Sequence, residues 1–349
     1  MKLSSRLAAL SAAPYFTSLI TVALLLLMLA LGAVGYTGFL STQVMLNLLI
    51  DNAYLLVIAI GMSFVILSGG IDLSVGSVLA LTTMLSAWLL QVWHWPPLLV
   101  IVCVLALGAL FGAVMGALIH FFRLQAFIVT LAGMFLARGL CYLISINSIT
   151  IDDPLFVAMS QTRLEFGEVF ISPSVVIALA VLALAIWMGH YTRFGRAVYA
   201  VGGNEQSALL MGLPVGRTKV MIYAFSGFCA AMGGVLFSFY MLSGYGLHAQ
   251  GAELDAIAAV VIGGTLLTGG YGYVAGTLTG VLILGVIQTL IAFDGTLSSW
   301  WTKIFIGALL FIFCVAQRII SVGSGKRAAH KASAPQTGVQ PGRESLAGG

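Results

Sequence analysis

The sequence predicts an all-α polytopic membrane protein with about ten transmembrane helices. Of its 349 residues, 60% are hydrophobic and 7% are charged, whereas a soluble domain has about 25% charged residues. The mean hydropathy is +1.10. The apolar residues form continuous runs of about 20 residues, which is the length that a helix needs to cross a bilayer. Continuous runs disfavour a transmembrane β-barrel, because apolar residues alternate in barrel strands.

The apolar runs define one transmembrane permease domain over residues 15–322. A short cytoplasmic segment, residues 1–14, precedes it. The tail at residues 323–349 is small and polar, and this composition predicts disorder. The ten predicted spans cover residues 15–36, 45–67, 74–92, 97–120, 124–146, 172–190, 218–242, 254–270, 273–292 and 300–319.

The distribution of Lys and Arg predicts that both chain ends are cytoplasmic. Cytoplasmic loops of membrane proteins are enriched in these residues. With the amino terminus inside, 12 of the 15 basic residues fall on the cytoplasmic side. The longest external loop, residues 147–173, instead carries four acidic residues and only Arg163. This loop is either a solvated connector or a docking surface for a soluble partner.

A short polar break at residues 68–77 interrupts the apolar sequence and recurs 200 residues later. The Ser-Gly-Gly at 68–70 corresponds to the Thr-Gly-Gly at 268–270, and the Gly-Ser at 76–77 corresponds to a Gly-Thr at 276–277. Glycine-broken apolar segments in corresponding halves of a chain are typical of transporter pathways. By the predicted spans the two copies run in the same direction, whereas inverted repeats are common, so the orientation of the repeat stays open. We expect the pair to act as hinges and packing breaks.

Several functional classes lack their motifs in this chain. Cys103, Cys141, Cys229 and Cys314 are single residues in apolar runs without metal-ligand or CxxC spacing. The five histidines are also solitary, so we expect no metal or other cofactor. The Gly-Ser-Gly-Lys-Arg at 323–327 lacks the spacing of a phosphate-binding loop, so ATP hydrolysis would require another protein. The basic residues lie between spans rather than in one patch, which argues against nucleic acid as a partner.

The cytoplasmic loop at residues 192–219 has the pattern of a short helix with its own caps. Asn204 is placed to cap the start of this helix, and Gly212 followed by Pro214 to end it. Glu205 and Ala208 are three residues apart and therefore lie on one side of it. The loop is either an ordinary connector or a lever that docks onto another subunit.

Long stretches of the chain resemble the permease subunits of ribose-type ABC sugar importers, and the resemblance covers nearly all of residues 40–320. The run FDGTLSSWWTKIFIGALLFIF at 293–313 looks most like one of the two permeases of a galactofuranose importer. The other stretches are residues 51–82, 127–140, 200–215 and 253–291.

This resemblance implies an inner-membrane permease, embedded in lipid, with several protein partners. These are a periplasmic sugar-binding protein, a cytoplasmic ABC ATPase, and a second permease that is either a paralogue or another copy of the chain. In the family a Gly-Asn-Glu-x-x-Ala-x-x-x-Gly loop is the coupling helix that sits in the ATPase. Carried over to this sequence, the ATPase contact falls on Gly203, Asn204, Glu205, Ala208 and Gly212.

Polar and glycine residues within or beside the spans are candidates for a sugar passage or its gate. Neutral sugars require hydroxyl, amide and aromatic contacts rather than formal charges. Asp72 is an acid within the membrane region, and we interpret it as a helix cap or gate rather than a sugar contact. Each polar side chain could instead hold helices together. The candidates are Asn52, Gly69, Gly70, Asp72, Ser74, Phe127, Thr130, Thr265, Gly269, Gly270 and Gln288.

The sequence therefore predicts the permease subunit of an ATP-driven importer of a monosaccharide, either galactofuranose-like or another pentose or hexose. The chain itself is predicted to be a transport subunit and not an enzyme. The alternative is a secondary sugar transporter driven by an ion gradient. That class needs a buried ionisable relay, for which Asp72 and Arg138 provide little material, and the sequence identifies no partner for Arg138. A non-transporting scaffold is disfavoured by the polar breaks.

Overall fold

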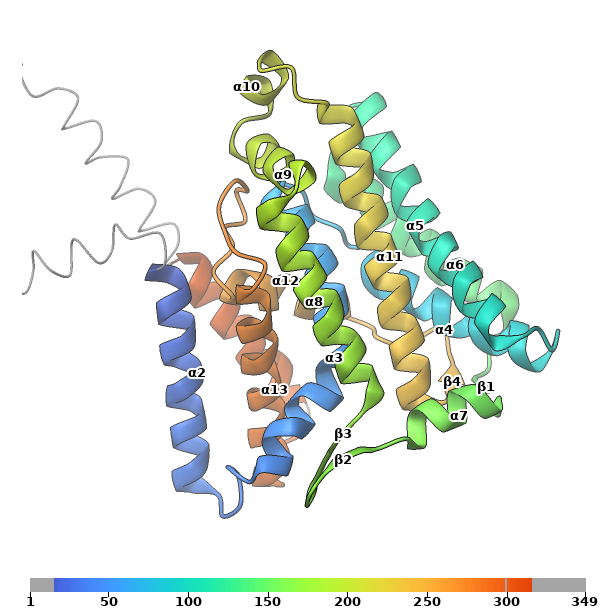
Figure 1. Cartoon of the computed structure of the whole chain (residues 1–349), viewed down its shortest axis with the longest axis vertical. Helices are drawn as coiled ribbons and strands as arrows, with labels where there is room; N and C mark the ends of the chain where they lie inside the picture. Colours follow the sequence, from blue (N-terminus) through green and yellow to red (C-terminus); the bar gives the residue numbers. More distant parts are fainter. Residues whose placement is uncertain (1–15, 299, 316–349) are drawn as a thin grey trace, which may run out of the picture.

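The computed structural model describes residues 16–298 and 300–315, which form a bundle of helices with four short strands (Figure 1). The predicted terminal segments at 1–14 and 323–349 lie outside these residues. The strands are β1 (Ile149–Thr150), β2 (Leu164–Phe166), β3 (Val169–Ile171) and β4 (Ser243–Gly244). The helices are α2 (Phe16–Gly35), α3 (Thr42–Leu67), α4 (Val75–Gln91), α5 (Pro97–Phe121), α6 (Ala126–Ile144), α7 (Pro154–Gln161), α8 (Pro173–Tyr191), α9 (Arg193–Gly203), α10 (Glu205–Leu210), α11 (Val215–Met241), α12 (Ala252–Ile262), α13 (Gly276–Asp294) and a further helix at Trp300–Val315.

Six of the described helices are long and apolar enough to cross a membrane: α3, α5, α6, α8, α11 and α13. Three shorter apolar helices lie at Leu19–Gly35, Val75–Gln91 and Trp300–Val315. The predicted class, a helical polytopic membrane protein, is confirmed by these helices. The number of ten spans stays a prediction.

The predicted span at residues 254–270 is wrong at its carboxyl end, because α12 stops at Ile262. Glycines with positive φ follow it, at +99° for Gly264, +80° for Gly269 and +75° for Gly270. These left-handed conformations are incompatible with a continuing right-handed helix. The second glycine break therefore lies inside a loop at residues 263–275, whereas the first break directly follows α3. The sequence repeat is not matched by equal helix boundaries.

Helix α3 is the centre of the bundle. Every residue from Leu55 to Leu67 is buried, and a helix that is apolar on all sides requires such complete enclosure. It packs against α8, α11, α12 and α13. The outer helices α5, α6 and α8 keep many large apolar side chains exposed, as expected for surfaces in contact with lipid.

The close packing between α5 and α11 follows a row of glycines on α5 at four-residue spacing, Gly108, Gly112 and Gly116. A Cβ atom at Gly108 would lie 2.6 Å from the carbonyl oxygen of Gly227, and one at Gly116 would lie 2.8 Å from the Cα of Val220. A Cβ at Gly112 would overlap the carbonyl oxygen of Tyr223. Small residues at four-residue spacing thus bring the two backbones into contact, as in other membrane helix pairs.

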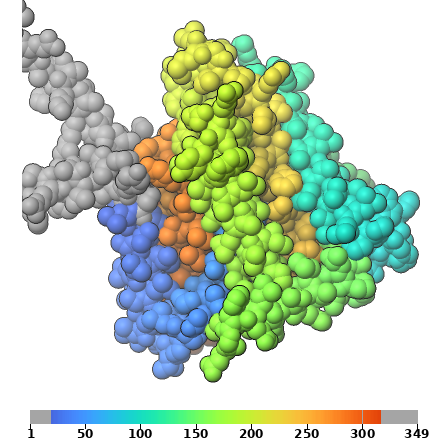
Figure 2. Space-filling model, viewed as in Figure 1, coloured from blue at the N-terminus to red at the C-terminus, as the bar shows by residue number. Residues whose placement is uncertain are grey.

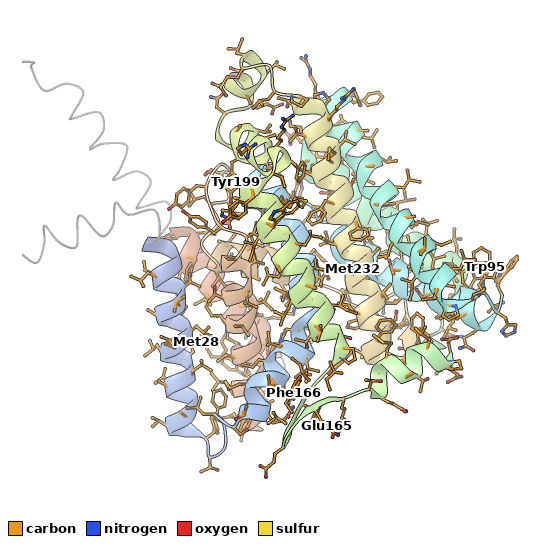
Figure 3. The ribbon with its side chains drawn as sticks, viewed as in Figure 1. Met28, Trp95, Glu165, Phe166, Tyr199 and Met232 are labelled. Carbon is orange, nitrogen blue, oxygen red and sulfur yellow. The ribbon has the colours of Figure 1, made fainter. Side chains whose placement is uncertain are left out.

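The two ends of the bundle carry different structures (Figure 1). At one end α10 extends beyond the long helices, and α9 lies beside the ends of α8 and α11; Figure 2 shows α10 as a bulge above α8. At the other end lie α7 and the β2–β3 hairpin, with Glu165 and Phe166 at its tip, far from Tyr199 on α9 (Figure 3). Strand β1 pairs with β4 near the same end. We call the end with α9 and α10 the α10 end, and the end with α7 and the β2–β3 hairpin the hairpin end.

We expect Gly112→Ala to lower the melting temperature of the detergent-solubilised protein, although alanine is the better helix former. The added methyl group must displace the α11 backbone at Tyr223, and such overpacking costs about 1–3 kcal/mol. Gly139→Ala on α6 is the matched control, because nothing lies within 4 Å of a Cβ at that position. Equal melting temperatures for the two variants would contradict this view of the α5–α11 contact.

Candidate functional site

Three pairs of glycines from distant parts of the chain meet at the α10 end. The backbone N–H of Gly270 donates to the carbonyl oxygen of Leu67 at 2.8 Å, which joins the second break to the first. A Cβ at Gly269 would lie 2.6 Å from the nitrogen of Gly69, and one at Gly270 would lie 2.7 Å from the Cα of Gly203. A Cβ at Gly202 would overlap the Leu67 oxygen. Both predicted breaks and the last turn of α9 therefore form one contact, which we call the glycine junction.

A large cavity of about 900 Å³ opens beside the glycine junction. Its walls come from the first break, the end of α5, the segment before α6, the α9–α10 region and the start of α11. The cavity includes polar groups of several kinds, both neutral and charged. The residues that carry them are Ser68, His120, Arg123, Asn204, Glu205, Gln206, Lys219 and Tyr223.

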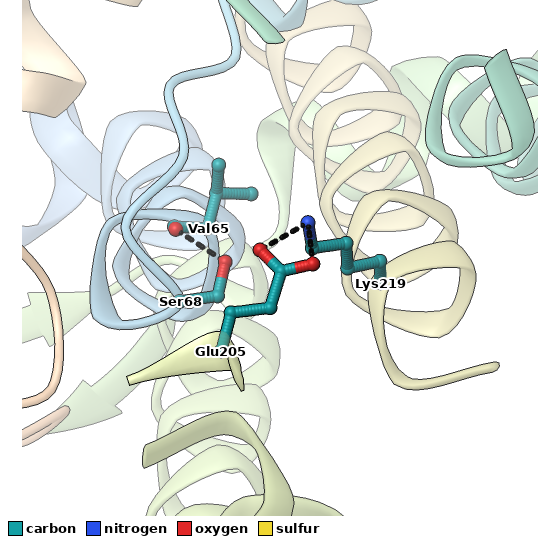
Figure 4. A network of polar contacts seen from close by, with 4 residues as sticks. All are labelled: Val65, Ser68, Glu205 and Lys219. Carbon is teal, nitrogen blue, oxygen red and sulfur yellow. Dashed lines mark hydrogen bonds and ion pairs between the residues drawn. The ribbon is translucent and has the colours of Figure 1, made fainter. Parts of the chain in front are cut away.

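Helix α10 has the caps that the sequence predicted. The Asn204 side chain accepts a hydrogen bond from the backbone N–H of Ser207 at 2.8 Å, and Gly212 after the helix has φ of +76°. Glu205 reaches across the cavity to Lys219 on α11, whose Nζ lies 2.7 Å from a carboxylate oxygen. Figure 4 shows this ion pair beside Ser68 of the first break. Ala208 is instead fully buried against Val201 and Val215, so its side chain supports α10 rather than forming an outer surface.

The carboxylate of Asp72 is buried and accepts three hydrogen bonds. The backbone N–H and the hydroxyl of Ser74 donate to Oδ1 at 2.9 and 2.6 Å, and the Ser226 hydroxyl donates to Oδ2 at 2.8 Å. Asp72 thus closes the turn before α4 and ties it to α11. All these donors are internal to the chain, and the N-cap position of α4 is held by Ser74, so the role of Asp72 as a cap or gate stays a prediction.

Arg138, for which the sequence offered no partner, lies against the segment between β4 and α12. Its Nη1 donates to the carbonyl oxygens of Gly246 and His248 at 2.5 and 2.8 Å. The imidazole Nδ1 of His248 lies 3.4 Å from the Thr83 hydroxyl on α4. Burial, and then the nearby Arg138 cation, lower the pKa of His248, so this ring is neutral at pH 7. Arg138 holds a non-helical segment against the bundle.

The other predicted pathway residues do not gather in the cavity. Asn52 donates to the Leu48 oxygen of its own helix, and its Nδ2 faces Gly285 on α13, the helix that also carries half-buried Gln288. Phe127 is half exposed on the outside of α6. Thr130 donates to the Ala126 oxygen at 2.8 Å and is 3.4 Å from that of Ile71. Thr265 is buried beside Gly272.

Sequence reasoning missed the residues of α11 that complete the site. Tyr223 and Ser226 lie one turn apart and face Gly70 and Asp72 respectively. Gly202 was also missed as a member of the glycine junction. In the sequence, Tyr223 and Ser226 look like ordinary members of the apolar span that forms α11. Only the crossing of α11 over the first break shows their position.

The chain thus combines long apolar helices around broken segments with a separately capped helix at one end, as in a membrane transport protein. Residues 44–314 match the family described as "Branched-chain amino acid transport system / permease component". The chain belongs to this family. Its members are transport subunits, not enzymes, so the predicted class is confirmed.

Several relatives are permeases of ABC transporters. The chain is 52% identical over 288 residues to the inner membrane ABC transporter permease protein YjfF of Escherichia coli (strain K12), covering 82% of this chain and 87% of the relative. It is 38% identical over 319 residues to the fructose import permease protein FruG of Bifidobacterium longum (strain NCC 2705), covering 89% and 93%. It is 38% identical over 270 residues to the ribose import permease protein RbsC of Escherichia coli (strain K12), covering 76% and 82%.

The resemblance to permeases of ABC importers is therefore confirmed, and with it a multi-pass membrane protein of this type. These relatives do not test the narrower resemblance to a galactofuranose permease. No solved structure matches the chain.

We expect Asp72→Ala to destabilise the protein by about 1–3 kcal/mol, because buried donors at Ser74 and Ser226 lose their acceptor. Ser226→Ala should cost less, since Asp72 keeps two of its three hydrogen bonds. Denaturation of the purified variants, followed by tryptophan fluorescence, measures both effects. A cap function predicts that Asp72→Asn, which keeps an oxygen acceptor, retains most of the transport rate. A variant that is stable but inactive would instead indicate direct contact with substrate.

Proposed function

We propose that this chain is the transmembrane permease subunit of an ATP-driven importer that translocates a monosaccharide delivered by a periplasmic binding protein. The observation that carries this proposal is the contact of the α9–α10 segment with both glycine breaks. This segment belongs to a chain whose relatives are ABC permeases. A displacement of α10 would reach α3 through Gly202 and the 263–275 loop through Gly203.

The α10 end is proposed to face the cytoplasm, with both chain termini on that side. Arg123, Arg193, Arg196, Arg217 and Lys219 all belong to segments at this end, as the charge bias of cytoplasmic loops requires. The hairpin end carries the acidic loop at 147–173 and is proposed to receive the binding protein. The six long helices together with α2, α4, α12 and the Trp300–Val315 helix would then supply ten membrane segments.

The tip of α10 is proposed to dock into the ATPase. Leu209, Leu210 and Met211 are exposed apolar residues, Leu210 with 89% of its surface accessible. Asn204 and Gly212 define the two ends of the helix, and the buried side chain of Ala208 packs the helix against the rest of the chain. A capped helix held on one side and apolar on the other is suited to transmit the closure of an ATPase dimer.

We propose a monosaccharide as the substrate class, because this chain matches a fructose import permease and a ribose import permease over most of the length of each relative. The neutral polar residues of the cavity lining, Ser68, Asn204, Gln206 and Tyr223, agree with such a substrate. Within this class we propose a galactofuranose-like sugar, on the resemblance of residues 293–313 alone. The second permease is proposed to be a paralogue, since the galactofuranose importers that this run resembles use two different permeases. Copurification of two differently tagged copies of the chain would contradict that.

A secondary transporter driven by protons or sodium is the alternative function. Such a protein needs an ionisable relay within the membrane, but Asp72 is bound by hydroxyl and N–H donors, and Arg138 by carbonyl oxygens. Reconstitution in proteoliposomes separates the two mechanisms. We expect uptake of one radiolabelled sugar from ribose, xylose, fructose and galactose to require ATP, the ATPase and the binding protein; the galactose solution supplies the furanose form at equilibrium. Uptake without ATP that is abolished by ionophores would overturn the proposal.

We expect Glu205→Lys to uncouple ATP hydrolysis from sugar uptake and to reduce uptake at least tenfold. The variant places two like charges where Glu205 and Lys219 now form an ion pair, and it reverses the charge that α10 presents. Measured ATPase activity and uptake in the same proteoliposomes give the coupling ratio. Unchanged uptake would contradict the assignment of α10.

The double variant Glu205→Lys with Lys219→Glu restores an ion pair with reversed polarity. If Glu205 acts only by holding α10 to α11, this swap should restore uptake. If Glu205 also contacts the ATPase, as we propose, uptake stays low in the swapped protein. The single variant Arg217→Glu, an exposed site at the same end, controls for a general change of charge.

A further inference from the structure

The hydroxyl of Tyr223 is the most unusual polar group in the cavity at the α10 end. Tyr223 is 2% exposed, and its Oη has no hydrogen-bond partner among the residues that the structure describes. A buried hydroxyl without a partner is unfavourable, and most such groups in native structures are paired. The oxygen lies against Gly70, where a Cβ atom would overlap it. Both residues line the cavity.

We propose that this cavity is a binding site for the transported sugar on its way to the cytoplasm, and that Tyr223 is the residue that binds it at the inner end. This inference rests on the proposed import of a monosaccharide. Beyond the proposed import, the inference names the cavity as the substrate site, Tyr223 as the residue that contacts the substrate, and the α9–α10 segment as the element that opens the cavity.

The lining suits a neutral molecule rich in hydroxyl groups. A volume of about 900 Å³ lies within the roughly 300–1,000 Å³ that small-molecule sites occupy. Asn204 uses its Oδ1 for the α10 cap, which leaves its Nδ2 as a donor, and Gln206 adds a second amide. The Ser68 hydroxyl donates to the Val65 oxygen at 2.7 Å and can still accept a hydrogen bond.

An anion is a poorer occupant of this cavity. The Lys219 ammonium already pairs with both oxygens of Glu205, at 2.8 and 2.7 Å. Arg123 is then the only uncompensated cation among the lining residues with formal charge. Phosphate-binding sites usually present several cations or converging N–H groups, and this lining does not.

The position of Tyr223 connects the sugar to the glycine junction. The turn at residues 68–70 lies directly against Oη, since a Cβ on Gly70 would overlap it, so a movement of this turn would open Oη to a ligand hydroxyl. That turn contacts Gly269 directly, and Leu67, the residue just before the turn, has its carbonyl oxygen against Gly202. Movement of α9 and α10 would therefore expose the Tyr223 hydroxyl, a buried group of the cavity lining that has no partner among the described residues. The structure thus provides a reason for substrate release to depend on the position of α10.

The test uses thiol labelling of the full chain, reconstituted with its ATPase and binding protein, in a transport-competent background where the four native cysteines are replaced by alanine. In the Gln206→Cys variant the thiol lies in the cavity. In the Arg217→Cys variant it lies at the same end but outside the lining. The probe is whichever sugar of the ribose, xylose, fructose and galactose panel shows ATP-dependent uptake, added from the cytoplasmic side.

We expect this sugar to slow maleimide labelling of the Gln206→Cys variant at least threefold and to leave the Arg217→Cys variant unchanged. ATP-dependent uptake without any protection of the cavity thiol would overturn the site while leaving the proposed function intact. If no sugar of the panel is taken up, the proposed function fails, and this site fails with it.

Tyr223→Phe separates binding from folding. Because the hydroxyl has no partner among the described residues, its removal should leave the melting temperature unchanged or raise it. The sugar concentration that gives half-maximal protection should nevertheless increase about threefold to tenfold, the effect of one lost hydrogen bond. An unchanged half-maximal concentration, or a clear loss of thermal stability, would overturn the proposed contact.

Discussion

Contact between glycine backbones is the constraint on which this structure depends. At the glycine junction, the end of α3, the loop at 263–275 and the end of α9 approach so closely that a Cβ on Gly202, Gly269 or Gly270 would meet backbone atoms. The hydrogen bond from Gly270 to Leu67 adds direction to this contact. Because glycines also tolerate positive φ at low cost, the same positions are both tightly packed and able to turn.

The glycine junction connects the end of α3 and the loop at 263–275 to the end of α9, and the capped helix α10 follows directly after α9. Helix α3 is enclosed on all sides, so a displacement at its end is transmitted to the helices that surround it. Helix α10 is anchored by Ala208 and by the ion pair to α11, while its tip remains free. A partner that pulls on the tip therefore acts on both glycine breaks and on the walls of the cavity at once.

Two ionisable side chains inside the bundle, Asp72 and Arg138, are paired with groups of the same chain. Asp72 is surrounded by donors from Ser74 and Ser226, and Arg138 by carbonyl oxygens. In a lipid environment such pairing is needed, because an unsatisfied polar group costs several kcal/mol. The Tyr223 hydroxyl, which has no partner among the described residues, is the group that we propose for contact with the sugar.

The sequence by itself determined the membrane class, most helix boundaries and the caps of α10, because these follow from local composition and spacing. It also contained the resemblance that the relatives confirm at the level of the family. Only the tertiary structure decided that α12 ends at Ile262, that Asn52 and Phe127 lie away from the cavity, and that Arg138 binds backbone oxygens. The meeting of Gly69, Gly202 and Gly269, and the position of Tyr223 above Gly70, likewise depend on contacts between residues more than 60 positions apart. No local pattern encodes such contacts, because they arise from the way whole helices cross.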